Sequence, residues 1–141
     1  MVVRGSYKPL SRVVMVTEVA QSRVLLVEDD PDTRDVMSRL LRRAHWDVDT
    51  VTTVGEALLF IKQSAPSSLP THVLLDLMLP DATGLVFLQY VRRLRLPMRV
   101  AVVTASGPDS AIVADAKLLN PDALFHKPAV FSDIEAWLNR D

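Results

Sequence analysis

Short strand-like segments alternate strictly with segments of helical periodicity, and this alternation limits the possible folds more than any other feature of the chain. The apolar runs at 24–27 and 100–103 are uninterrupted, which is typical of central parallel strands buried on both faces. Residues 47–51 alternate polar and apolar side chains, as in a strand with one wetter face. The five predicted strands are 24–27, 47–51, 73–75, 100–103 and 123–125. This order predicts an α/β fold, a doubly wound five-stranded parallel sheet with right-handed crossovers.

Helix-start signals follow the predicted strands. Asp30 is a suitable N-cap and Pro31 suits the first helical position, so the first helix is expected to begin there. The last helix is expected to be capped by Ser132 and to run through Leu138. The helices between them are predicted at 55–63, 85–93 and about 109–119.

Length and composition exclude several classes of protein. The 141 residues suit one domain, and 16 Lys and Arg against 17 Asp and Glu provide no general attraction to nucleic acid. The absence of Cys excludes disulfides and Cys-ligated zinc. No apolar stretch approaches the roughly 18 residues of a membrane span, and no secretory signal is evident, so we expect a cytoplasmic protein without membrane insertion. Residues 1–21 are expected to be a flexible extension or an added edge element, and 22–141 the folded domain.

Polar residues collect where the predicted strands end. Parallel strands bring their carboxyl ends to one edge of the sheet, where α/β proteins bind ligands. The polar residues at this edge are Glu28, Asp29, Asp30, Asp76, Thr104 and Lys127. A cluster of oxygen ligands without His or Cys suits a hard cation, and one that shares its ligands with phosphate suits Mg²⁺.

The acidic residues at this edge divide by expected role. Asp30 is assigned to helix capping, which does not require Glu28 and Asp29 as well. Asp76 directly follows an apolar run, and a carboxylate there can accept a phosphoryl group if a metal and a cation neutralise the developing charge. Its alternative is a solvated acid that opens a loop. Lys127, considered alone, is more often a surface lysine.

Four motifs in register give the chain a recognisable resemblance. They are VLLVEDD at 24–30, LLDLMLPDATG at 74–84, VVTAS at 102–106 and HKP at 126–128. In order and spacing they resemble the receiver domains of two-component response regulators, over about residues 22–140. The resemblance implies a flavodoxin-like (βα)5 receiver fold.

The resemblance also implies a role for each matched residue. The implied ligands of Mg²⁺ are Glu28, Asp29, Asp76 and the backbone carbonyl of Met78. The implied phosphoryl-binding residues are Asp76 as the acceptor, Thr104 and Lys127.

Three positions depart from the family pattern. Leu124 stands where the family usually has a switch aromatic, which questions a signal relayed by a swinging ring. His45 replaces a Gly that often ends the first helix, so a left-handed conformation there would carry some cost. Residues 120–122, Asn-Pro-Asp, replace a common Gly-Ala pair, so we expect a rebuilt turn.

The leading hypothesis is a single-domain response regulator that accepts a phosphoryl group onto Asp76 from a sensor histidine kinase or a phosphotransfer protein. Only enough residues follow Lys127 for one helix, so output is expected through a downstream protein partner, or through a domain missing from this sequence, and not through direct nucleic-acid binding. One alternative is a pseudo-receiver, an interaction module that signals without phosphorylation. Another is a phosphohydrolase with an aspartyl-phosphate intermediate, which Met78 disfavours because that chemistry needs a second acid there.

Overall fold

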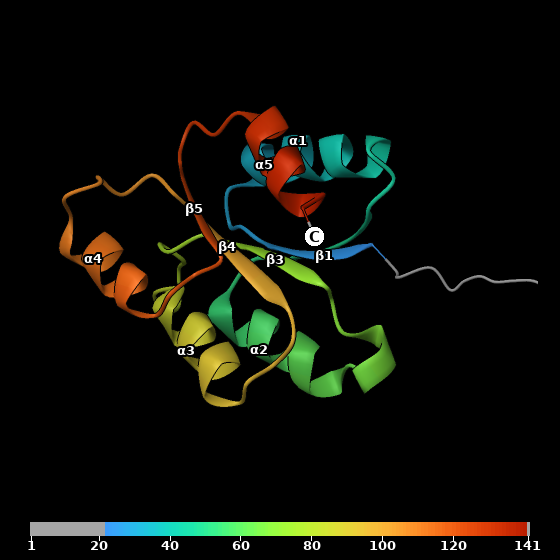
Figure 1. The fold of residues 1–141 in the computed structure, drawn as a ribbon, viewed down its shortest axis with the longest axis horizontal. Coiled ribbons are helices and arrows are strands. Elements are labelled where there is room, and N and C mark those ends of the chain that lie inside the picture. The colour runs from blue at the N-terminus through green and yellow to red at the C-terminus, as the bar shows by residue number, and fades with distance from the viewer. Residues whose placement is uncertain (1–21, 141) are drawn as a thin grey trace, which may run out of the picture.

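A computed structural model describes residues 22–140, so the predicted extension at 1–21 lies outside the described residues. Strands and helices alternate along the chain, as the sequence predicts (Figure 1). The strands are β1 (Arg23–Val27), β2 (Asp47–Val51), β3 (His72–Leu75), β4 (Arg99–Thr104) and β5 (Ala123–His126). The α-helices are α1 (Pro31–Arg43), α2 (Val54–Gln63), α3 (Leu85–Arg93), α4 (Ala111–Leu118) and α5 (Phe131–Leu138), and a short 3₁₀ helix spans Pro66–Ser68.

The five strands form one sheet in the order β2-β1-β3-β4-β5, and every pairing is parallel. This order confirms the predicted doubly wound, flavodoxin-like fold. The register places Val27 beside both Val51 and Leu75. The carboxyl ends of β1 and β3 therefore lie next to each other at one edge of the sheet.

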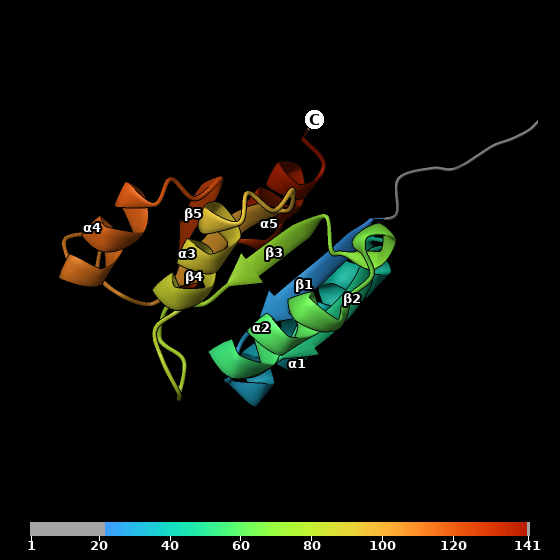
Figure 2. The same cartoon turned by 90° about the horizontal axis from the view of Figure 1, so that it is seen from below.

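Helices cover both faces of the sheet, with α1 and α5 on one face and α2, α3 and α4 on the other (Figures 1 and 2). Alternate residues of the central strands supply the two cores. Leu25 and Val27 pack with α2, α3 and α4, whereas Val24 and Leu26 pack with α1 and α5. The uninterrupted apolar run of β1 is explained by this burial on both faces.

The helix ends confirm some of the predicted caps and correct others. Asp30 caps α1, since its Oδ2 accepts a hydrogen bond from Thr33 N at 2.8 Å. The predicted cap at Ser132 is wrong, because α5 already begins at Phe131 and Val130 occupies the N-cap position. Helix α4 is shorter than predicted at both ends. No helix in the described part of the chain is long and apolar enough to cross a membrane.

The two unusual turns that the sequence indicates have left-handed residues. His45 has a φ of 69° after α1, and Asn120 has a φ of 51° after α4. In the second turn, Asp122 Oδ2 accepts hydrogen bonds from Val100 N at 2.7 Å and from Arg92 Nη2 at 3.1 Å. The side chain of Asp122 thus ties β5 to β4 and α3 at the end of the sheet opposite the predicted site.

Candidate functional site

The site is built on backbone hydrogen bonds that continue the sheet one residue past each strand. Glu28 N donates to Val51 O at 3.0 Å and Asp76 N donates to Val27 O at 3.1 Å. Lys127 N donates to Thr104 O at 2.7 Å. These bonds fix the backbones that carry the predicted acids, hydroxyl and ammonium at one edge of the sheet.

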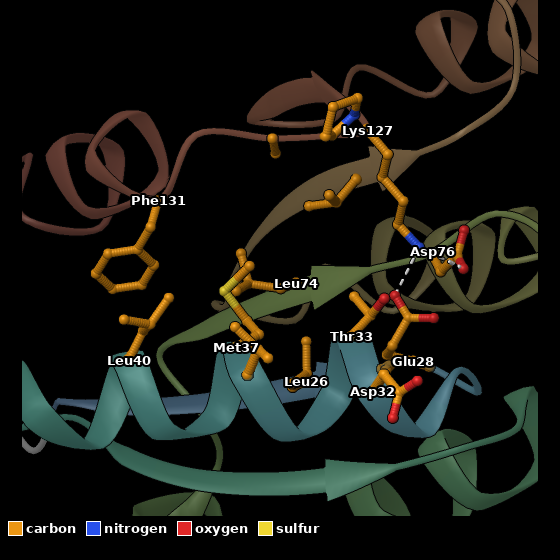
Figure 3. A pocket seen from close by; sticks show the side chains of 15 residues that line it. Leu26, Glu28, Asp32, Thr33, Met37, Leu40, Leu74, Asp76, Lys127 and Phe131 are labelled. Atoms are coloured by element: carbon orange, nitrogen blue, oxygen red, sulfur yellow. Dashed lines mark hydrogen bonds and ion pairs between the residues drawn. The ribbon is translucent and has the colours of Figure 1, made fainter.

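Lys127 bridges two of the acids (Figure 3). Its Nζ lies 2.7 Å from Glu28 Oε1 and 3.1 Å from Asp76 Oδ2. Glu28 and Asp76 are only 3% and 6% exposed. A buried carboxylate is stable only when paired or hydrogen-bonded, and Lys127 supplies that pairing to both.

Burial and pairing act in opposite directions on the two ends of this bridge. Burial raises the pKa of Glu28 above its usual value, although the hydrogen bond from Lys127 favours the ionised carboxylate. Burial alone would lower the pKa of Lys127, but the hydrogen bonds and charges of Glu28 and Asp76 outweigh it and leave that pKa raised. Lys127 therefore carries its charge at neutral pH.

Glu28, Asp29 and Asp76 form a cluster of acids with oxygen atoms that lie within 4.8 Å of one another. Ligands on opposite sides of one Mg²⁺ ion lie about 4.2 Å apart, twice the usual metal–oxygen distance. The cluster needs only a small closure to share one ion. Its all-oxygen donor set, with net negative charge even beside Lys127, fits a hard divalent cation and is typical of the Mg²⁺ site of receiver domains.

Asp30, the third acid of the triplet, lies apart from this cluster. Its side chain caps α1, as predicted, and its pKa is lowered by the hydrogen bonds it accepts from Thr33. Its backbone N–H donates to Glu28 Oε2 at 3.1 Å. Asp30 therefore contributes to the site through its backbone, by holding one oxygen of Glu28.

The segment after Asp76 folds back against Asp76 itself. Met78 N donates to Asp76 Oδ1 at 3.3 Å, and Gly84 N donates to Leu77 O at 2.7 Å. A Cβ on Gly84 would lie 2.3 Å from Asp76 O, closer than such atoms approach in proteins. Glycine at 84 therefore permits the return of the loop onto the backbone of Asp76.

Thr104 is fully buried at the end of β4, which lies between β3 and β5, and its carbonyl oxygen accepts the hydrogen bond from Lys127 N. Its Oγ1 accepts a hydrogen bond from Ser106 N at 3.0 Å. That bond uses a lone pair of the hydroxyl and leaves its proton available for another acceptor.

Leu124 packs with the core cluster of α2, α3 and α4 and is half-buried. The next residue, Phe125, packs on the opposite face of the sheet, where its ring centroid lies 6.5 Å from that of Trp137. Alternation along β5 therefore keeps the two side chains apart, and Phe125 cannot take the place of the missing aromatic at 124.

Two residues of the site's surroundings escaped the sequence analysis. Asp81 accepts hydrogen bonds from Val54 N at 3.0 Å and Gly55 N at 2.9 Å, which tie the loop after β3 to the start of α2. Arg34 Nη1 donates to the carbonyl oxygens of Glu28 and Asp29, each at 3.1 Å. The one sequence feature that could have pointed to Arg34 is its position: a basic residue is unfavourable near the start of a helix because of the macrodipole.

Comparison with known proteins decides the family. The model of the response regulator receiver domain matches residues 24–139. The chain belongs to the response regulator receiver family. A receiver domain is a phosphoacceptor signalling module and not a catalyst, and receiver domains accept phosphoryl groups from histidine kinases.

Curated relatives and solved structures agree with this assignment. A transcriptional regulatory protein, the CpxR homolog of Haemophilus influenzae, is 33% identical over 114 residues, which are 81% of this chain and 46% of that protein. A protein-glutamate methylesterase/protein-glutamine glutaminase of Agrobacterium fabrum is 39% identical over 101 residues, 67% of this chain and 27% of that protein. The signal receiver domain of a Luxo repressor protein from Vibrio parahaemolyticus superposes with a TM-score of 0.73 at 26% identity, covering 85% of this chain and 92% of that one. The chain spans less than half the length of these curated relatives, whereas it matches nearly all of the solved receiver domain.

Proposed function

We propose that the chain is a phosphorylation switch of a two-component phosphorelay. Asp76 accepts a phosphoryl group from a phosphohistidine of a sensor histidine kinase or of a phosphotransfer protein. The observation that carries this proposal is the placement of the Asp76 carboxylate beside the Lys127 ammonium, 3.1 Å away, and within the acidic cluster that it forms with Glu28 and Asp29. An anionic nucleophile flanked by a cation and a cation site is what phosphoryl transfer requires.

The proposed transfer is a nucleophilic substitution at phosphorus. An oxygen of Asp76 forms the new P–O bond while the P–N bond to the donor imidazole breaks, and the electron pair of that bond leaves with the imidazole nitrogen. Lys127 and the Thr104 hydroxyl donate hydrogen bonds to the transferred oxygens, because both have protons available at this edge. Mg²⁺, held by Glu28, Asp29, Asp76 and the Met78 carbonyl, would neutralise the remaining charge.

A protein donor is favoured by the surface next to the acceptor. A groove of about 570 Å³ runs from Asp76 and Lys127 between α1 and α5 (Figure 3). Its lining is mainly apolar, with Val36, Met37, Leu40, Ala129 and Phe131 along its walls. A helical segment of the donor that brings a phosphohistidine to Asp76 would cover this groove, and burial of its apolar lining would contribute to affinity.

Output is proposed to pass to a downstream protein partner through the surface formed by α4, β5 and α5. Closure of Thr104 and Lys127 on the phosphoryl group would move the loop after β4, which leads directly into α4. Because Leu124 is packing in the core, this route needs no ring rotation. A cytoplasmic location is part of the same proposal, since that is where histidine kinases donate phosphoryl groups.

The test is intact-mass measurement after incubation with Mg²⁺ and a small phosphodonor such as phosphoramidate. We expect a gain of one phosphoryl group, and no gain for Asp76→Asn, because the amide is nearly isosteric but a poor nucleophile. Asp30→Asn is the matched control, since it removes a neighbouring carboxylate while Asn still caps α1.

Labelling of Asp76→Asn as complete as that of the parent would show that the acceptor lies elsewhere. Failure of the folded parent to become labelled would favour the pseudo-receiver, an interaction module that signals without phosphorylation.

A further inference from the structure

Arg34 reaches back from α1 to the acidic end of β1. A single terminal nitrogen, Nη1, donates to Glu28 O and to Asp29 O, both at 3.1 Å. That nitrogen carries two hydrogens, so each carbonyl can receive one of them. The contact fixes two successive peptide groups, those on the carbonyl side of the two acids.

The two acids differ in how strongly other groups hold them. Glu28 is held by Val51 O through its backbone N–H and by Lys127 and Asp30 N through its side chain. Within the described residues, the bond from Arg34 is the only hydrogen bond that Asp29 makes. Arg34 is therefore the main restraint on an exposed acid of the cluster.

The position of Arg34 is unfavourable for the helix itself. A cation near the start of α1 faces the positive end of the macrodipole, and the neighbouring acids in that region are Asp30 and Asp32. Its side chain is half-buried against the carbonyls of the loop and makes no ion pair among the described residues. The macrodipole does not favour an arginine here, whereas the two hydrogen bonds to the loop give it a role.

We propose that Arg34 is a positioning residue that orients Asp29 as a ligand of Mg²⁺. This inference rests on the proposed function, because it assumes that the cluster of Glu28, Asp29 and Asp76 binds Mg²⁺. Arg34 touches neither the acceptor carboxylate nor the transferred group, and it acts through the backbone of the β1–α1 loop.

The direction in which Mg²⁺ affinity changes when Arg34 is replaced distinguishes a positioning role from a purely electrostatic one. Arg34 places a positive charge close to a cation site, so loss of that charge alone should tighten Mg²⁺ binding. Loss of the hydrogen bonds to the loop should weaken it, since residues that orient metal ligands typically change affinity 10- to 100-fold. The two explanations predict changes of opposite sign.

The experiment is calorimetric titration of Mg²⁺ into the full chain with no phosphodonor present, repeated with Mn²⁺ followed by electron paramagnetic resonance. Arg34→Gln and Arg34→Lys are compared with Arg39→Gln. Arg39 lies on the same helix, is exposed and pairs with Asp35 at 2.6 Å without touching the loop. Thermal unfolding of each variant verifies that it is folded.

We expect Arg34→Gln to weaken Mg²⁺ binding about tenfold, and Arg34→Lys to weaken it too, because a lysine keeps the charge but not the two-hydrogen geometry. Arg39→Gln should bind Mg²⁺ as the parent does. Labelling of Asp76 in Arg34→Gln should reach the parental rate at saturating Mg²⁺.

Three results would overturn the proposal: unchanged or tighter Mg²⁺ binding by Arg34→Gln, parental affinity in Arg34→Lys, or a lower maximal rate of labelling with an unchanged requirement for Mg²⁺. A parent chain that neither binds Mg²⁺ nor becomes labelled would instead refute the proposed function itself.

Discussion

His72 should make the stability of the domain depend on pH. It begins β3, is 8% exposed, and lies between Trp46 and Trp137, whose ring centroids are 5.2 and 5.3 Å from its own. Thr71 Oγ1 donates to Arg23 O at 2.8 Å, so the same hydroxyl accepts from His72 Nδ1 at 2.9 Å. The other ring nitrogen, Nε2, is buried without a hydrogen-bond partner among the described residues.

Protonation of Nε2 would place an unpaired charge between two indole rings. Burial and then the Arg99 guanidinium lower the pKa of His72 from 6.5 to about 4, against the opposing charge of Asp122. The unfolded chain therefore binds one proton more than the folded chain between these two pKa values. In that window the free energy of unfolding decreases as the pH falls, by about 2 kcal/mol between pH 7.5 and pH 5.

His72→Phe removes the titration and keeps a ring of similar shape between Trp46 and Trp137. Urea unfolding of both proteins, followed by tryptophan fluorescence at several pH values, measures the difference in their free energies of unfolding. We expect this difference to shift by about 2 kcal/mol in favour of the variant as the pH falls from 7.5 to 5. Contributions of groups such as Glu28 cancel because both proteins share them.

Parallel pH profiles for the two proteins would refute the reasoning. They would mean that His72 is protonated as readily in the folded chain as in the unfolded one, so that Nε2 has access to water or to a partner. A shift of opposite sign would mean that the folded chain binds the extra proton, and it would reverse the assigned role of burial.

Three further predictions concern the site. Gly84→Ala should push the loop off Asp76, lowering the free energy of unfolding by about 1–3 kcal/mol and slowing labelling in the mass assay. Parental values of both would show that a Cβ at position 84 does not clash with Asp76 O. Asp29→Ala should weaken Mg²⁺ binding much more than Asp30→Ala, which should mainly lower the melting temperature by uncapping α1; equal losses of affinity would overturn this division. Thr104→Ala should leave Asp76 able to be labelled, but it should abolish the change in amide exchange over α4 that a phosphoryl mimic induces. Leu124→Ala should mainly reduce the free energy of unfolding, by about 2 kcal/mol. An exchange pattern in the parent that the mimic leaves unchanged would favour the non-switching interaction module.

The fold was predictable because few topologies satisfy the pattern of apolar runs. Buried runs such as 24–27 require a sheet covered on both faces, and right-handed crossovers then leave little choice of connection. The juxtaposition of Glu28, Asp76 and Lys127 follows from the same rule, since parallel strands end at one edge. The sequence alone therefore predicts that these residues, which are far apart in the chain, lie together.

Contacts that depend on side-chain reach could not be predicted in this way. Asp81 caps α2 from a loop that follows β3, and no sequence signal connects it with Val54 or Gly55. The prediction of a cap at Ser132 is wrong because the preference of a residue for the N-cap position does not by itself fix where a helix begins. Ser is a favoured N-cap residue, but the chain after Pro128 enters α5 two residues earlier, with Val130 in the extended conformation at the N-cap.

The two hydrogen bonds that Glu28 accepts link the resting site to its proposed switching. Lys127 lies 2.7 Å from Glu28 Oε1 and 3.1 Å from Asp76 Oδ2, so in the unphosphorylated chain it pairs with both acids. A phosphoryl group on Asp76 adds oxygens with greater negative charge and competes with Glu28 for the ammonium. Because Glu28 also accepts a hydrogen bond from Asp30 N, it can release Lys127 without becoming wholly unpaired. In the proposed switch, Lys127 would move from one acid to the phosphoryl group, and its backbone bond to Thr104 O would couple that movement to the end of β4.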